Sequence, residues 1–126
     1  MLRSAPKVET PPIKRETGIN AMDKETLEKM IEGGQDNALL RFTLGSLCLK
    51  KGKIEDALSH LEQALKMNAK HSATWKAYGK ALTKADRNRE ALDAYRQGIE
   101  VAQSLGDIQA VKEMRVFLRR LEAKKS

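Results

Sequence analysis

The sequence contains few of the residues that build metal sites, disulfide frameworks or aromatic cores. Its 126 residues include one cysteine and two histidines, and aromatic residues make up only 4% of the chain. The single Cys48 excludes an internal disulfide and any metal site built from several cysteines, and its apolar neighbours Leu47 and Leu49 predict a small buried side chain. Neither His60 nor His71 has a carboxylate or cysteine at a metal-ligand spacing, so we expect no metal site.

Candidate catalytic groups also lack the partners that chemistry requires. Nucleophiles such as Ser46 have no partner base. His60 follows Asp56 by four residues, a spacing that we interpret as a surface hydrogen bond and not as a catalytic dyad. We therefore expect a protein without enzymatic activity and without a cofactor.

Prolines and long apolar runs are missing from most of the chain. All three prolines lie in the N-terminal segment 1–21, where mixed charge and few apolar residues predict a disordered tail. This tail is either a flexible tether or a product of the chosen start site, since Met22 directly precedes the first predicted helix. No stretch approaches the ~18 apolar residues of a membrane span. No apolar segment follows Arg3, so we expect no signal peptide and a cytoplasmic protein.

What the chain does contain is an internal repeat of 34 residues. Residues 38–71 align with residues 72–105, and small residues coincide: Gly45 with Gly79, Ala57 with Ala91, and Ala64 with Gly98. Apolar residues coincide as well: Leu44 with Tyr78, Leu58 with Leu92, Leu61 with Tyr95, and Leu65 with Ile99. A fixed period in this range predicts stacked antiparallel helical hairpins, an all-α solenoid.

Helical periodicity and capping residues predict about six helices. The first is expected between a cap at Asp23 and a stop at Gly33–Gly34, and the others over residues 38–50, 54–67, 73–84, 89–104 and 108–123. The expected N-terminal caps are Asp23, either Asp36 or Asn37, Ser72, and Asp107. The predicted single domain, 22–126, is divided into a half-repeat (23–34), two repeats (38–71 and 72–105) and a capping helix (107–123).

The small residues of the repeat predict close helix crossings. No side chain is expected to fit at Gly45 against Ala57, or at Gly79 against Ala91. Glycine within a helix costs about 1 kcal/mol relative to alanine, so its recurrence at one phase indicates a larger gain from packing. The residues predicted to hold the repeat together are Leu44, Gly45, Ala57, Leu61, Ala64, Trp75, Tyr78, Gly79, Ala91, Tyr95 and Gly98.

These residues resemble a known family, the tetratricopeptide repeat (TPR). The second repeat carries the family's pattern at Trp75, Tyr78, Gly79, Leu82, Ala91 and Tyr95. The first repeat departs from it at Arg41 and Cys48, where the family prefers aromatic residues, and Ala69 and Gln103 replace the closing proline. The chain also resembles small bacterial proteins built from two such repeats and a terminal helix. The resemblance implies a right-handed superhelix with a concave groove that holds an extended peptide or a partner helix, and it implies no chemistry.

Two complete repeats are few for a stable stack, because about three are normally needed. The half-repeat is expected to cover one end of the stack and the last helix the other. The expected inner face of the last helix is Ala110, Val111, Met114, Phe117, Leu118 and Leu121, and its charged outer face is Lys112, Arg115, Arg119 and Glu122. A homodimer that buries one end is the competing solution.

The family's groove-facing positions give a surface with two parts. In the first repeat these positions are Leu39, Phe42, Ser46, Leu49 and Lys50, and in the second they are Ala73, Lys76, Lys80, Thr83 and Lys84. Asn and Arg, which help some relatives to grip a C-terminal carboxylate, are missing from them. The pattern suits a short acidic peptide with an aromatic or aliphatic anchor. Alternatively, the lysines are merely solvated, and Leu39 and Phe42 pack against Leu27 or Ile31.

The function predicted from the sequence is therefore a non-enzymatic protein-protein interaction module. One alternative is a homo-oligomeric structural adaptor. Another is a nucleic-acid-associated protein, given the net charge of +7 and the bases of the last helix, Arg115, Arg119, Arg120, Lys124 and Lys125. Against nucleic acid, the aromatic residues needed for base stacking are scarce, Trp75 and Tyr78 are expected in the core, and Glu113 and Glu122 interrupt the last helix.

Overall fold

Six α-helices follow one another in the part of the chain that the computed structural model describes, residues 24–34 and 36–125. They are α2 (Lys24–Glu32), α3 (Ala38–Lys50), α4 (Ile54–Met67), α5 (Ser72–Lys84), α6 (Asn88–Leu105) and α7 (Ile108–Lys125). The helices expected over 38–50 and 54–67 have those bounds, and the ends expected at Lys84 and Ile108 also agree. The starts of α5 and α6 and the ends of α6 and α7 differ by one or two residues. The predicted tail 1–21 and the predicted cap Asp23 lie outside the described residues.

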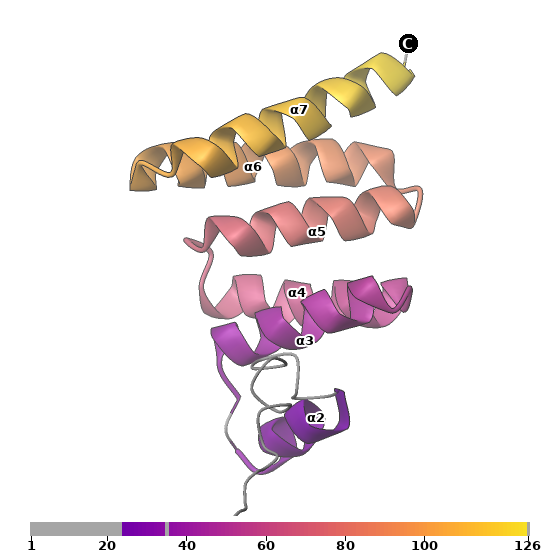
Figure 1. Cartoon of the computed structure of the whole chain (residues 1–126), viewed down its shortest axis with the longest axis vertical. Coiled ribbons are helices and arrows are strands. Elements are labelled where there is room, and N and C mark those ends of the chain that lie inside the picture. The colour runs from indigo at the N-terminus through magenta and orange to yellow at the C-terminus, as the bar shows by residue number, and fades with distance from the viewer. Residues whose placement is uncertain (1–23, 35, 126) are drawn as a thin grey trace, which may run out of the picture.

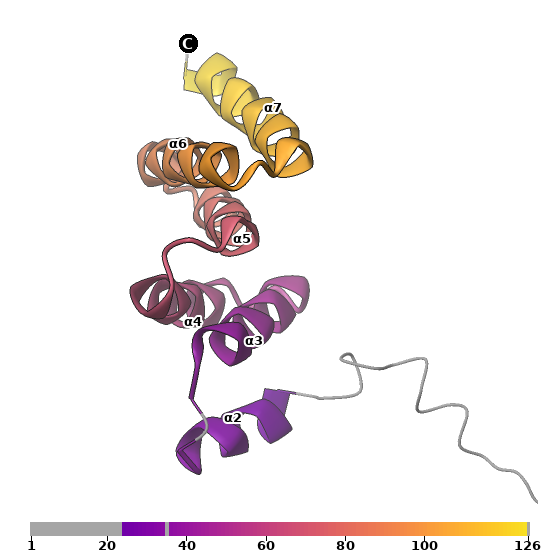
Figure 2. The ribbon, with the colours of Figure 1, turned by 90° about the vertical axis from the view of Figure 1, so that its left-hand side faces the viewer.

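The helices pack as sequential hairpins in an elongated stack (Figure 1). Helix α3 pairs with α4, α5 pairs with α6, and α7 lies on α6 at one end while α2 lies against α3 at the other. Figure 2 shows α3, α5 and α7 toward one side of the stack and α4 and α6 toward the other. Contacts also join α3 to α5 and α5 to α7. The all-α hairpin prediction is confirmed, whereas the division into a half-repeat, two repeats and a capping helix stays a prediction.

Two of the expected caps fix helix N-termini. Of the two candidates before α3, Asn37 is the cap, and its Oδ1 accepts a hydrogen bond from the backbone N–H of Leu40 at 2.8 Å. At α7 the Oδ1 of Asp107 accepts from the N–H of Ala110 at 3.2 Å. Each bond satisfies a backbone donor that a helix N-terminus leaves without a partner.

The prediction that Ser72 caps α5 is wrong. The helix begins at Ser72 itself, and the preceding His71 occupies the cap position without a capping side-chain hydrogen bond. Ser72 is buried, and its hydroxyl donates to Oδ2 of Asp107 at 2.9 Å. A serine before a helical run is a common cap, but here a carboxylate 35 residues later provides a charged acceptor, and hydrogen bonds to charged groups are the stronger ones.

The core is aliphatic and runs through the whole stack. Its largest fully buried side chains include Leu27, Leu44, Leu61, Leu82, Tyr95 and Met114, and Cys48 is buried as expected. Trp75 and Tyr78 were expected in the core but are only half-buried. The Trp75 indole N–H donates to the carbonyl of Ala69 at 2.7 Å, and the Tyr78 hydroxyl donates to Oε2 of Glu62 at 3.0 Å. Both rings therefore pack their apolar bodies against the core and keep their polar atoms at its edge.

Three glycines mark places where helices approach too closely for a side chain. A Cβ atom at Gly45 would lie 2.7 Å from Leu61 Cγ, and one at Gly79 would lie 2.5 Å from Tyr95 Cε1. The side chains that fill these spaces belong to Leu61 and Tyr95, one helical turn beyond the predicted Ala57 and Ala91. At Gly45 the predicted neighbour is also close, because the added Cβ would lie 3.4 Å from the Ala57 carbonyl oxygen. At Gly98 the Cβ would lie 2.5 Å from Met114 Sδ. The missing side chain at Gly98 thus lets α7 pack closely against α6.

Arg41 stands where the second repeat has Trp75, and it holds the start of α3 in place. Its Nε and Nη2 atoms donate to the two carboxylate oxygens of Asp36, both at 2.9 Å. Its Nη1 lies 3.0 Å from His60 Nδ1 on α4. The expected surface hydrogen bond between His60 and Asp56 is therefore replaced by one to Arg41, which places His60 as an acceptor.

His60 makes the stability of the stack dependent on pH. Burial lowers the pKa of His60, and the positive charge of Arg41 lowers it further, against the opposing effect of Glu28 and Asp56. The folded state thus favours the neutral ring, and as the pH falls His60 is protonated in the unfolded chain before it is protonated in the folded protein. The neutral His60 ring therefore contributes fully to the free energy of unfolding above the ordinary histidine pKa of about 6.5. This contribution is lost as the pH falls through the lower pKa of the folded state.

We expect the urea midpoint of the parent to fall between pH 7.5 and pH 5.5 by more than that of His60→Gln. Glutamine can accept from Arg41 but does not titrate, so it serves as the matched reference. Circular dichroism at 222 nm measures both midpoints. The same pH dependence in the two proteins would contradict this role of His60.

Candidate protein-interaction groove

A cavity of about 690 Å³ lies between α3 and α5, and we call it the α3–α5 groove. It is lined by Phe42, Thr43, Ser46, Leu47, Leu49, Lys50, Ala73, Lys76, Ala77, Lys80 and Lys84. Every residue predicted to face a groove is among these except Leu39 and Thr83. The helical phase taken from the repeat thus brings most of the predicted side chains together in space.

Leu39 and Thr83, the two predicted residues that do not line the α3–α5 groove, lie outside it. Leu39 is 67% exposed in the first turn of α3 and does not line this cavity. Thr83 lines a neighbouring cavity between α5 and α7, and its hydroxyl donates to the Gly79 carbonyl at 2.8 Å. Phe42 is half-buried and meets the ring of His71 edge-on, with the ring centroids 5.0 Å apart. Phe42 is therefore available as an apolar wall of the groove.

The three lysines predicted to face the groove from α5, Lys76, Lys80 and Lys84, differ in their surroundings. Lys76 Nζ lies 2.5 Å from Oε1 of Glu113, which comes from α7. The hydrogen bond from Lys76 is the main reason that the pKa of Glu113 is lowered, with a second contribution from Gln109. Lys76 is thus paired within the protein, whereas Lys80 and Lys84 make no such ion pair among the described residues. The sequence identified Glu113 only as an acid that interrupts the last helix, and its pairing with Lys76 was missed.

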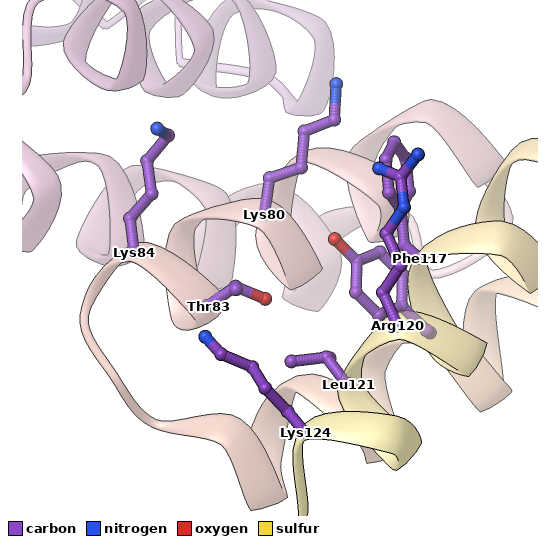
Figure 3. Close-up of a pocket in the computed structure, with 8 residues that line it drawn as sticks. Lys80, Thr83, Lys84, Phe117, Arg120, Leu121 and Lys124 are labelled. Atoms are coloured by element: carbon purple, nitrogen blue, oxygen red, sulfur yellow. The ribbon is translucent and has the colours of Figure 1, made fainter.

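A second cavity, of about 570 Å³, lies between α5 and α7, and we call it the α5–α7 pocket (Figure 3). It is lined by Lys80, Thr83, Lys84, Tyr95, Phe117, Arg120, Leu121 and Lys124. Phe117 was expected on the inner face of the last helix, and it is half-buried. The charge pattern of the last helix indicated Arg120 and Lys124 only as part of a nucleic-acid surface. Their position beside α5 depends on how α7 packs.

Aromatic rings form the floor of this pocket. The rings of Tyr95 and Phe117 lie 5.6 Å apart between centroids. Lys80 Nζ lies 5.2 Å and Arg120 Cζ 5.8 Å from the centroid of the Phe117 ring, within the range of cation–π attraction. Burial raises the pKa of Tyr95 to about 12, so its hydroxyl is neutral at physiological pH. The pocket therefore has an apolar floor and a cationic rim.

Other kinds of site find little support in the described ranges. Residues 24–34 and 36–125 contain no group of three or more His, Cys, Asp or Glu side chains placed to hold a metal ion. Within the same ranges, every helix is too short or too polar to span a lipid bilayer.

The stacked hairpins with an open groove define a helical-repeat scaffold, a class that binds its partners along extended surfaces. A family model described as tetratricopeptide repeat matches residues 49–114. The chain belongs to the tetratricopeptide repeat family, and the prediction made from the 34-residue pattern is confirmed. Proteins of this family are typically protein-interaction modules.

Bacterial relatives support the same assignment. The TPR repeat-containing protein PA0015 of Pseudomonas aeruginosa is 48% identical over 98 residues, which are 78% of this chain and 93% of that protein. The solution structure of protein BPP2914 from Bordetella parapertussis is 44% identical and has a TM-score of 0.72, covering 80% of this chain and 88% of the other. The crystal structure of a tetratricopeptide repeat domain protein from Salinibacter ruber is 27% identical, with a TM-score of 0.66 over 70% of this chain and 98% of that one.

Proposed function

We propose that this protein is a non-enzymatic interaction module that binds a peptide or helix of a partner protein in the α3–α5 groove. The observation that carries the proposal is the composition of that cavity. Phe42, Leu47 and Leu49 on α3 supply an apolar wall, and small alanines on α5 leave room opposite them. Binding sites for apolar anchors have this form, with a concave apolar surface and a few polar groups around it.

The lysines of the groove support an acidic partner. Lys50, Lys80 and Lys84 line the same cavity as the apolar wall, and Lys76 is already paired with Glu113. Charges at the rim of an interface raise the association rate and select against partners of like charge. A segment with an aliphatic or aromatic anchor and acidic neighbours matches both features.

The test is selection of peptides against the immobilised full chain from a displayed library of random twelve-residue sequences. We expect the enriched peptides to share an apolar residue flanked by Asp or Glu. Fluorescence anisotropy then gives the Kd of a labelled enriched peptide. Phe42→Ala is expected to weaken binding about tenfold or more, because truncation of an interface anchor commonly costs 1 to 2 kcal/mol.

Leu39→Ala is the matched control for this experiment. It removes an apolar side chain from the same helix at a residue outside the groove, and the Kd should change by less than about twofold. Equal binding by the parent and Phe42→Ala would contradict the proposal. Affinity that falls a hundredfold or more between about 50 and 200 mM salt would indicate a nucleic-acid-type surface. A mass that rises with concentration, with no peptide enriched, would indicate a homo-oligomeric adaptor.

A further inference from the structure

Four cationic side chains surround the α5–α7 pocket. Lys80 and Lys84 come from α5, and Arg120 and Lys124 come from α7. None of the residues that line the pocket is acidic. Among the described residues, none of the four cations lies within ion-pair distance of a carboxylate. Cations gathered in one concave surface raise the local potential and attract anions.

The cations are spread around the opening and do not converge on one point. Figure 3 shows the nitrogen ends of Lys80, Lys84, Arg120 and Lys124 well separated, with Thr83 between the two helices. The Phe117 ring lies beneath two of these groups, Lys80 and Arg120. A single phosphate is best held by donors that converge on it, whereas spread cations suit several separate single charges. The arrangement therefore favours neighbouring carboxylates.

The pocket is continuous with the α3–α5 groove. Lys80 and Lys84 line both cavities, so they form the boundary that the two cavities share. A segment whose apolar anchor lies against Phe42 can extend across α5 and reach Arg120 and Lys124. The surface thus divides into an apolar part between α3 and α5 and a cationic part between α5 and α7.

We propose that the α5–α7 pocket is an anion subsite that receives paired carboxylates, two neighbouring Asp or Glu side chains, of the partner segment. This inference rests on the proposed function and adds the position of the acidic residues, which lie beyond α5 relative to the anchor. It assigns the main recognition of charge to Lys80, Lys84, Arg120 and Lys124, whereas the sequence predicted Lys76, Lys80 and Lys84. Lys76 has no part in it, because Glu113 already neutralises that lysine.

The test uses two small probes that do not depend on the peptide selection, acetyl-Leu-Glu-Glu-amide and acetyl-Leu-Gln-Gln-amide. Each is titrated into the ¹⁵N-labelled full chain at low salt and followed by amide chemical shifts. We expect the acidic probe to shift the amides of Thr83, Phe117 and Arg120, and the amide probe to leave them unchanged. The double variant Arg120→Gln/Lys124→Gln on α7 is expected to weaken binding of the acidic probe about tenfold. The single variant Lys84→Gln on α5 is expected to weaken it several-fold.

Lys112→Gln/Arg119→Gln is the matched control variant. It removes the same two charges from the same helix at exposed residues that do not line the pocket, and the Kd should stay within twofold of the parent. Equal amide shifts with both probes, or equal losses of affinity in both double variants, would overturn the subsite.

Acidic-probe shifts confined to α3 would overturn the subsite and leave the proposed function standing. Stronger displacement of the acidic probe by an RNA dodecamer than by a Glu-rich peptide of the same length would also overturn it. If the display selection fails while the acidic probe still marks the pocket, the proposed function fails and the anion site stands.

Discussion

Replacing Gly79 by leucine is expected to unfold the stack. Even one added Cβ atom would lie 2.5 Å from Tyr95 Cε1 and 2.6 Å from Cζ, so the buried ring must move before any larger side chain fits. Overpacking of a dense core by a few carbons typically costs 1–3 kcal/mol, and leucine also separates α5 from α6 along its whole length. We expect a loss of more than about 3 kcal/mol, a large share of the 5–15 kcal/mol that stabilises a typical domain.

Thermal and urea denaturation followed by circular dichroism measure this effect. A melting temperature within a few degrees of the parent would contradict the close-approach argument. A double-mutant cycle separates the clash from general damage, using Gly79→Ala, Tyr95→Ala and the combination. Because removal of the ring makes space for the new Cβ, the double variant should lose about 1–2 kcal/mol less than the sum of the single losses.

Replacing Met114 by aspartate is expected to release α7 from the stack. Met114 is fully buried, and its sulfur lies over Gly98 on α6. Aspartate would remove the apolar contact and place a carboxylate in the core. Deletion of a buried methionine side chain alone costs about 2–5 kcal/mol, and burial of an unpaired charge adds to that loss. We expect a loss of at least about 4 kcal/mol in the free energy of unfolding, measured by urea denaturation.

Val116→Asp is the control for this variant. It introduces the same charge two residues later on the same helix, at a side chain that is 37% exposed. Its free energy of unfolding should lie within about 0.5 kcal/mol of the parent, because substitutions at such surfaces change little. Equal stability of Met114→Asp and Val116→Asp would show that α7 does not depend on its contact with α6. Loss of the acidic-probe shifts in Met114→Asp alone would tie α7 to the cationic pocket as well.

The fold could be predicted because its determinants lie within one period of the sequence. Gly45 and Gly79 recur at one phase, and a helix crossing is the physical reason for a glycine at that point. The prediction that failed concerned which residue caps the N-terminus of α5. Ser72 has the chemistry of a cap, but its hydroxyl donates to Asp107, the residue that precedes α7. Local capping rules cannot include an acceptor 35 residues away.

The candidate site was predictable to the extent that helical phase determines it. Phase alone places Phe42, Ser46, Lys76 and Lys80 on one surface, and they line one cavity. The partners supplied by α7 were not predictable, because the period gives no angle between α5 and α7. Glu113 thus changed the role of Lys76. The α5–α7 pocket requires side chains from both helices and becomes visible only in three dimensions.

The ties between α5 and α7 lie at one end of the helix pair. Ser72 bonds to Asp107, which caps the N-terminus of α7, and Lys76 pairs with Glu113 in the N-terminal half of that helix. At the C-terminal ends Lys84 and Lys124 line the same pocket, so charges of like sign lie on both helices there. The pair is therefore tied by polar bonds at one end and carries charges of like sign at the other. Salt acts on the two ends with opposite sign: it weakens the ion pair at the tied end and screens the charges of like sign at the other, within a screening length of about 8 Å at physiological ionic strength.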